Sequence, residues 1–135
     1  MKNTALILVL SLLVLTCSFE VNAQSSNYKN VTKNSIKTLE QGIKSENEGV
    51  RRSSIYMAGL YKIDEVVDVL VDQLHREKDS NTKILIALAL YNIGNPKGME
   101  AVKDLSAKDQ DMRVKRMTTA IYRAYTENYE DISQR

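Results

Sequence analysis

Three aspartates at four-residue spacing are the side chains whose types and positions could do chemistry together. Asp64, Asp68 and Asp72 would lie along one face of a helix. Such a row of carboxylates could bind Ca²⁺, or could supply a general acid and a general base. The segment has no glycine-bearing loop of the calcium-binding type, so we interpret the row as the solvated face of an amphipathic helix. A carboxylate-based site in an accessory or lyase-like enzyme is the alternative.

Other reactive side chains are too few for a catalytic or metal-binding set. The chain has one cysteine, Cys17, and one histidine, His75. These counts exclude zinc–thiolate and multi-histidine sites, and no Ser-His-Asp pattern accompanies His75. We therefore expect the protein not to be an enzyme, and to have no catalytic, cofactor-binding or metal-binding residues.

Basic residues gather near the starts of three predicted helices. The six are Arg51, Arg52, Lys83, Arg113, Lys115 and Arg116. Cations at the start of a helix oppose its dipole, so nearby acids should compensate them. Acidic turns with Asp79, Asp109 and Asp111 could do so. We interpret the basic residues as partners of these turns that hold neighbouring units together, and a basic surface for an acidic partner is the alternative.

Five tyrosines fall on the same three helices. Tyr61, Tyr91 and Tyr122 recur at nearly equal spacing, and this regularity predicts that they fill the seams between units. Tyr56 and Tyr125 depart from the spacing. We expect those two to be exposed, where the large ring and hydroxyl of tyrosine suit recognition of a partner.

Apolar residues at three- and four-residue spacing predict six helices. The first begins near Ser35, and the others span 50–63, 64–77, 82–93, 97–107 and 112–128. Asp64 should cap the third helix, and Gly94 with Pro96 should end the fourth. Because no segment shows the alternation of a strand, the predicted fold class is all-α.

The helices alternate between two types. Tyr61, Tyr91 and Tyr122 occupy matching places in the second, fourth and sixth helices, so the sequence repeats once every two helices. A repeat of this length made of two helices predicts a short right-handed α-solenoid of about three helix pairs, in which each pair buries its apolar face against the next. The helix of residues 82–93 is apolar on nearly every side. We attribute this to packing by both neighbouring pairs, which places Leu88 in the core. On the last helix, Met117 is expected to face inward.

The segment 1–23 has the pattern of a secretory signal peptide. Lys2 precedes an apolar run over 5–15, and Val21 and Ala23 are small residues at the −3 and −1 positions of a cleavage site. The run is too short to span a membrane. We expect an exported protein, periplasmic or secreted, and a lipoprotein anchored through Cys17 is the alternative.

The remaining chain divides into a flexible lead-in at 24–34, a repeat domain at 35–128 and a C-terminal tail at 129–135. The formal net charge is +2. So small a charge does not favour a nucleic acid, and we expect neither a nucleic-acid partner nor a membrane span.

Several motifs resemble the HEAT-like repeats of bacterial proteins, including the phycobilisome-lyase type. Two segments resemble the start of the family's repeat unit, namely Val50-Arg51-Arg52 and Met112-Arg113-Val114-Lys115. One segment resembles its end, namely Gly94-Asn95-Pro96. The resemblance covers about residues 35–128. It implies a binding scaffold without a catalytic set, whose concave face is formed by the second helix of each pair.

The sequence therefore predicts an exported, non-enzymatic module that holds a protein or peptide on this concave face. The residues expected to contact the partner are Arg52, Tyr56, Lys83, Asn92, Lys115 and Arg116.

Overall fold

A computed structural model describes the backbone of residues 32–133 and the side chains of residues 32–128. The predicted signal peptide, nearly all of the lead-in and the side chains of the tail lie outside these residues. The helices are α2 (Lys33–Ile43), α3 (Glu48–Leu60), the 3₁₀ turn η1 (Asp64–Val66), α4 (Val67–Arg76), α5 (Ser80–Ile93), α6 (Pro96–Lys108) and α7 (Met112–Ser133). The part of the chain that the structure describes contains no strand, in agreement with the predicted fold class.

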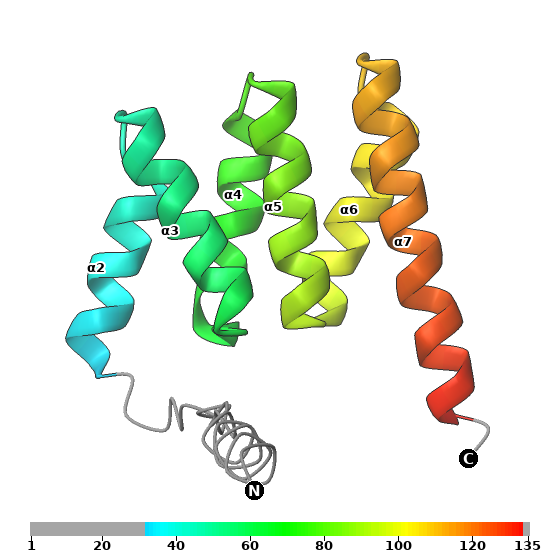
Figure 1. Cartoon of the computed structure of the whole chain (residues 1–135), viewed down its shortest axis with the longest axis horizontal. Coiled ribbons are helices and arrows are strands. Elements are labelled where there is room, and N and C mark those ends of the chain that lie inside the picture. The colour runs from blue at the N-terminus through cyan, green and yellow to red at the C-terminus, as the bar shows by residue number, and fades with distance from the viewer. Residues whose placement is uncertain (1–31, 134–135) are drawn as a thin grey trace, which may run out of the picture.

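The helices form three antiparallel pairs arranged in two layers. The pairs are α2 with α3, α4 with α5, and α6 with α7. In one layer α3 packs against α5 and α5 against α7, while α2, α4 and α6 form the other layer (Figure 1). This is the predicted short solenoid, because each pair packs mainly against the pair next to it.

Short polar side chains fix where the second helices begin. Asn47 caps α3 by accepting from the amide of Val50, and Asp79 caps α5 by accepting from the amide of Thr82. Asp111 accepts from the amide of Arg113 at the start of α7. These three caps are evenly spaced along the chain, and their spacing is slightly longer than that of the tyrosines. α3 and α5 each begin two residues earlier than predicted because the caps precede the first apolar residues.

The starts of two helices differ from the prediction. Gly94 ends α5 in the left-handed conformation at φ +79°, as expected, but Pro96 begins α6 rather than only stopping α5. The prediction that Asp64 caps the third helix is wrong. Asp64 is the first residue of η1, the preceding Ile63 makes no side-chain cap, and the Asp64 carboxylate accepts from Asn95 Nδ2 at 2.7 Å instead.

The core lies between the two layers and between successive pairs. Its fully buried side chains include Ile55, Leu70, Ile86, Leu90 and Val102. The prediction that Leu88 lies in this core is wrong, since Leu88 is 39% exposed. α5 is covered by α3, α7 and the first-helix layer, and its fourth side faces solvent (Figure 1).

The inward-facing side of α7 differs from the prediction at Met117. Met117 was expected to face inward but is 43% exposed, and Thr118 is buried in its place between Val114 and Ile121. The Thr118 hydroxyl donates to the carbonyl of Val114 at 2.8 Å, so the polar atom has a partner inside the core. This local hydrogen bond is why a threonine can occupy an apolar stripe.

A glycine allows α3 and α5 to approach closely. A Cβ on Gly59 would lie 2.7 Å from the Cα of Ala89 and 2.9 Å from its Cβ. Two small residues therefore set the distance between these helices. Among the helices described, none is long and apolar enough to cross a membrane.

Candidate partner-binding surface

Two largely buried ion pairs each join a second helix to the turn that precedes the next second helix. We call these the junction pairs. In the first, Arg51 Nε on α3 lies 3.0 Å from Glu77 Oε2, just before α5. In the second, Lys83 Nζ on α5 lies 2.6 Å from Asp109 Oδ2, just before α7. Each cation is the fourth residue after its helix cap, and the two partners are equally far apart in the sequence in both pairs. The interpretation that basic residues pair with the acidic turns of the neighbouring unit is therefore confirmed for Lys83, whereas Arg51 joins the units through Glu77, an acid that was not among those predicted.

The carboxylate of Glu77 is almost enclosed, with 6% of its side chain exposed. Burial by itself would raise the pKa of its carboxyl. The amides of Asp79 and Lys78, the Gln73 side chain and the Arg51 charge together outweigh burial, so the pKa of Glu77 lies below its ordinary value. The carboxylate therefore stays ionised, and it was not among the residues that the sequence singled out.

The second junction pair has the same electrostatic character. Burial by itself would raise the pKa of Asp109. The hydrogen bond from Lys83, the amide of Asp111 and the Lys83 charge together outweigh burial, so the pKa of Asp109 lies below its ordinary value. Only 20% of the Lys83 side chain is exposed. Lys83, a predicted partner contact, is thus engaged in holding α5 to the turn before α7.

Arg52 makes a looser contact of the same kind. Its Nη1 lies 3.5 Å from Asp79 Oδ2 and donates to the Thr82 hydroxyl at 3.2 Å. Hydrogen bonds from the Thr82 hydroxyl and amide, aided by Arg52, keep the pKa of Asp79 below its ordinary value. The Arg52 side chain is 38% exposed, so it both joins the units and remains accessible.

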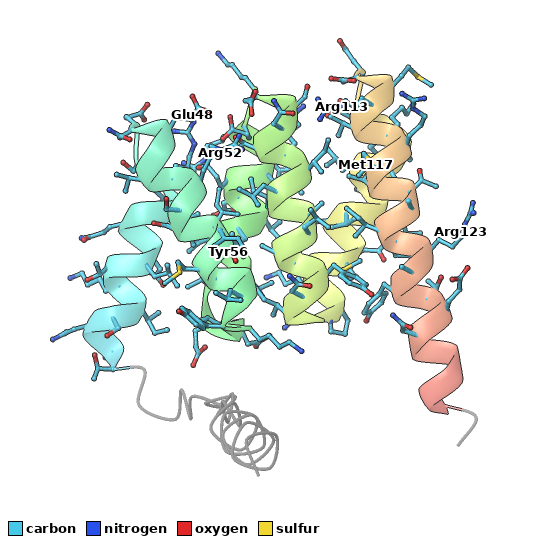
Figure 2. The ribbon with its side chains drawn as sticks, in the orientation of Figure 1. Glu48, Arg52, Tyr56, Arg113, Met117 and Arg123 are labelled. Atoms are coloured by element: carbon cyan, nitrogen blue, oxygen red, sulfur yellow. The ribbon has the colours of Figure 1, made fainter. Side chains whose placement is uncertain are left out.

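Exposed apolar side chains lie on the outer side of α3, α5 and α7. Tyr56 is 56% exposed, Leu88 39% and Met117 43%, and Leu85 on α5 is half-buried. We call these four residues the second-helix face. A shallow hollow of about 450 Å³ between α3 and α5 is lined by Arg52, Ser53, Tyr56, Met57 and Leu85. Figure 2 shows Arg52 and Tyr56 on α3 and Met117 on α7.

The predicted partner residues divide into three groups. Arg52 and Tyr56 line the same hollow, and Asn92 is exposed near the end of α5. Lys83 is in a junction pair. Lys115 and Arg116 line a different hollow, on the side of α7 away from the hollow between α3 and α5. The structure therefore does not bring all six together on one surface.

The aspartate row contributes to contacts between first helices. Asp64 accepts from Asn95, and Asp68 lies 2.7 Å from Lys97 Nζ. The hydrogen bond and charge of Asp68 raise the pKa of Lys97. Both Asp68 and Lys97 are largely exposed, as expected of a solvated face. Among the described residues, no three His, Cys, Asp or Glu side chains are grouped so that they could hold a metal ion.

The tyrosines follow the prediction with one exception. Tyr61, Tyr91 and Tyr122 are half-buried against the core, as expected for side chains at the seams, and Tyr56 is exposed. Tyr125 was expected to be exposed, but it is also half-buried, with its ring centroid 6.4 Å from that of Tyr122. Tyr91 also joins α5 to α7, since its hydroxyl accepts a hydrogen bond from Asn128 Nδ2 at 2.9 Å.

Comparison with known proteins agrees with this arrangement of helix pairs. The family model described as HEAT repeats matches residues 36–121. No curated protein matches the chain.

Proposed function

This chain belongs to the HEAT-repeat family, and from that premise we propose that it is an exported, non-enzymatic scaffold that holds a protein or peptide partner. Proteins built from HEAT repeats commonly serve as interaction scaffolds. The pattern of Lys2, the apolar run and the small residues Val21 and Ala23 supports export. We propose the second-helix face as the surface that receives the partner.

The observation that carries this proposal is the exposure of large apolar side chains across all three second helices. Tyr56, Leu88 and Met117 are each more than a third exposed. A large apolar side chain at a solvent-exposed position is unfavourable unless something covers it, so these residues indicate an interaction surface. Tyrosine and methionine are enriched at the centres of protein interfaces, and arginine accompanies them. Arg52 lines the same hollow as Tyr56 and is the arginine of this surface.

Accessible polar side chains lie on the same helices as these apolar groups. Arg52 stays partly accessible while paired with Asp79, and Asn92 is exposed farther along α5. An extended or helical peptide could therefore place apolar side chains against Tyr56 and Leu88 and polar atoms against these polar side chains.

Site-specific photo-cross-linking in the exporting cell tests the proposal. A photoreactive residue would replace Tyr56 or Leu88, and a control would replace Asp68 on the other layer. We expect a cross-linked protein or peptide at positions 56 and 88 and none at position 68. Cross-links at position 68 alone would move the binding surface to the first helices and refute the proposal.

Once that partner is identified, substitutions measure the contribution of the face. Tyr56→Ser with Leu88→Ser should weaken its binding by about tenfold or more, the loss of at least one anchoring side chain. Val50→Ser is the matched control, because Val50 is also exposed and apolar but lies outside the face. Equal effects of the two variants on affinity would contradict a specific surface.

A further inference from the structure

The junction pairs repeat in register, and among the described side chains the third position of that register holds a cation without an acid. Arg51 and Lys83 each occupy the fourth position after a helix cap, and each meets an acid of the next unit. Lys115 occupies the same position after Asp111 on α7. Among the described side chains, which extend to residue 128, no acid pairs with Lys115.

Lys115 lies in a hollow of about 430 Å³ on the side of α7 where a following unit would pack. We call this surface the C-terminal edge, and its residues are Met112, Lys115, Arg116, Thr119, Ala120 and Arg123. Figure 2 shows Arg123 extending from α7 on the side away from α5. Three cations and no acid line the hollow, so its charge is complementary to a carboxylate-bearing segment.

The centre of this edge differs from the two edges that are covered inside the molecule. At the eighth position after the cap, α3 has Ile55 and α5 has Ala87, and both are fully buried. α7 has the exposed Thr119 at that position. A polar centre does not need permanent cover, so the edge is suited to a partner that binds and dissociates.

We propose that the C-terminal edge is a second docking site, which takes an acidic segment of another protein. A carboxylate of that segment binds Lys115, as Glu77 binds Arg51 and as Asp109 binds Lys83 within the chain. Arg116 and Arg123 attract further acidic groups, and Met112 contacts its apolar side chains. The site is separate from the second-helix face and does not depend on it.

A second copy of this chain is a poorer occupant than an acidic segment. The position that provides Glu77 and Asp109 in the later units is Ser45 in the first unit. α2 and its C-cap residue also present the exposed lysines Lys33, Lys37 and Lys44. Head-to-tail stacking would therefore bring cations against the cations of the C-terminal edge.

The test is a titration of the full exported chain with a short peptide of alternating Glu and Ala, observed by NMR. The matching Gln–Ala peptide is the control for charge. We expect the largest shift changes at the amides of Lys115, Thr119 and Arg123, and no saturable change with the Gln–Ala peptide. Lys115→Met should raise Kd about fivefold or more, the loss of one charge-assisted contact.

Lys37→Met is the matched control, because it removes an exposed lysine at the opposite end of the solenoid. It should leave Kd within about twofold. If Lys37→Met weakens binding as much as Lys115→Met, attraction is diffuse and the proposal is wrong. Lys115-dependent dimerisation in sedimentation, or tighter Lys115-dependent binding to a DNA duplex than to the acidic peptide, would assign the edge to a different occupant and overturn it. Melting curves of both variants check that a decrease in binding does not come from a loss of folding.

Discussion

Replacing Glu77 by Gln should be one of the most damaging single changes in this protein that keep side-chain shape. The two oxygens of Glu77 have different partners. Oε1 accepts from the amides of Lys78 and Asp79 at 3.0 and 3.1 Å, and Oε2 accepts from Arg51 Nε at 3.0 Å and Gln73 Nε2 at 3.2 Å. Gln can keep its oxygen toward the two amides, but then its NH₂ group faces two donors.

The magnitude follows from the bonds that are lost. A hydrogen bond between charged groups contributes about 1.5–3 kcal/mol and a neutral one about 1 kcal/mol, so Glu77→Gln should lower the free energy of unfolding by about 2–4 kcal/mol. Arg51 is only 14% exposed and would lose its acid, although it would still donate to the carbonyl of Ser45. In a domain of this size, the loss corresponds to a decrease in Tm of roughly 10–20 °C.

Urea unfolding at neutral pH measures the change directly. Asp104→Asn is the control, because Asp104 pairs with Lys108 at 2.7 Å on the exposed surface of α6 and that pair is screened by solvent. A cycle with Arg51→Met should give a coupling free energy of about 1 kcal/mol or more. If Glu77→Gln shifts the midpoint no more than Asp104→Asn does, then Glu77 does not hold the units together.

The pH dependence of stability gives an independent check. The pKa of Glu77 is lowered in the folded protein, so its ionised form stabilises the fold fully above the ordinary value of 4.5. This stabilisation is lost as the pH falls from there through the lower folded-state pKa. Tm should therefore fall more steeply below pH 4.5 in the wild type than in Glu77→Gln, and parallel curves would contradict the assignment.

Three further predictions concern the core, the helix spacing and the leader. Leu90→Ala should cost about 2–5 kcal/mol in urea unfolding because Leu90 is fully buried, while Leu88→Ala should cost about 1 kcal/mol or less; the reverse order would contradict the orientation of α5. Gly59→Ala should destabilise by about 1–3 kcal/mol despite its better helix propensity, because its Cβ meets the backbone of α5, and an increase in Tm would show that the helices can separate freely. If the proposed signal peptide is cleaved, mass spectrometry of the protein expressed from its full sequence should find Gln24 at the N-terminus, whereas an acylated Cys17 would make it a lipoprotein.

The sequence predicted the number and pairing of the helices because the apolar spacing and the punctuating turns are strong local signals. It also predicted the contacts of Arg52 and Lys83 with acidic turns, since cations at helix starts require compensation. The pairing of Arg51 with Glu77 was missed. Glu77 precedes the acidic turn, and nothing in its local pattern indicates that it is buried.

The errors arose where periodicity carries little information. Residues 82–93 are apolar on nearly all sides, so the pattern could not show that Leu88 faces solvent while Leu90 is buried. Met117 and Thr118 compete for the same stripe, and only the local hydrogen bond of Thr118 explains why the threonine is inside. The division between the second-helix face and the C-terminal edge depends on the stacking of whole units, which local spacing does not encode.

The junction pairs also affect how the chain would fold and open. Each pair joins positions 26 residues apart, and the main helix packing joins each helix pair to its neighbour, so contacts stay between adjacent units and do not connect the two ends of the chain. Such a chain does not need to bring distant segments together before it gains stability. α5, which packs against both α3 and α7, is the centre from which order can spread to either side. Among the described helices, each outer pair packs against one other pair, so it can open singly while the middle pair stays closed.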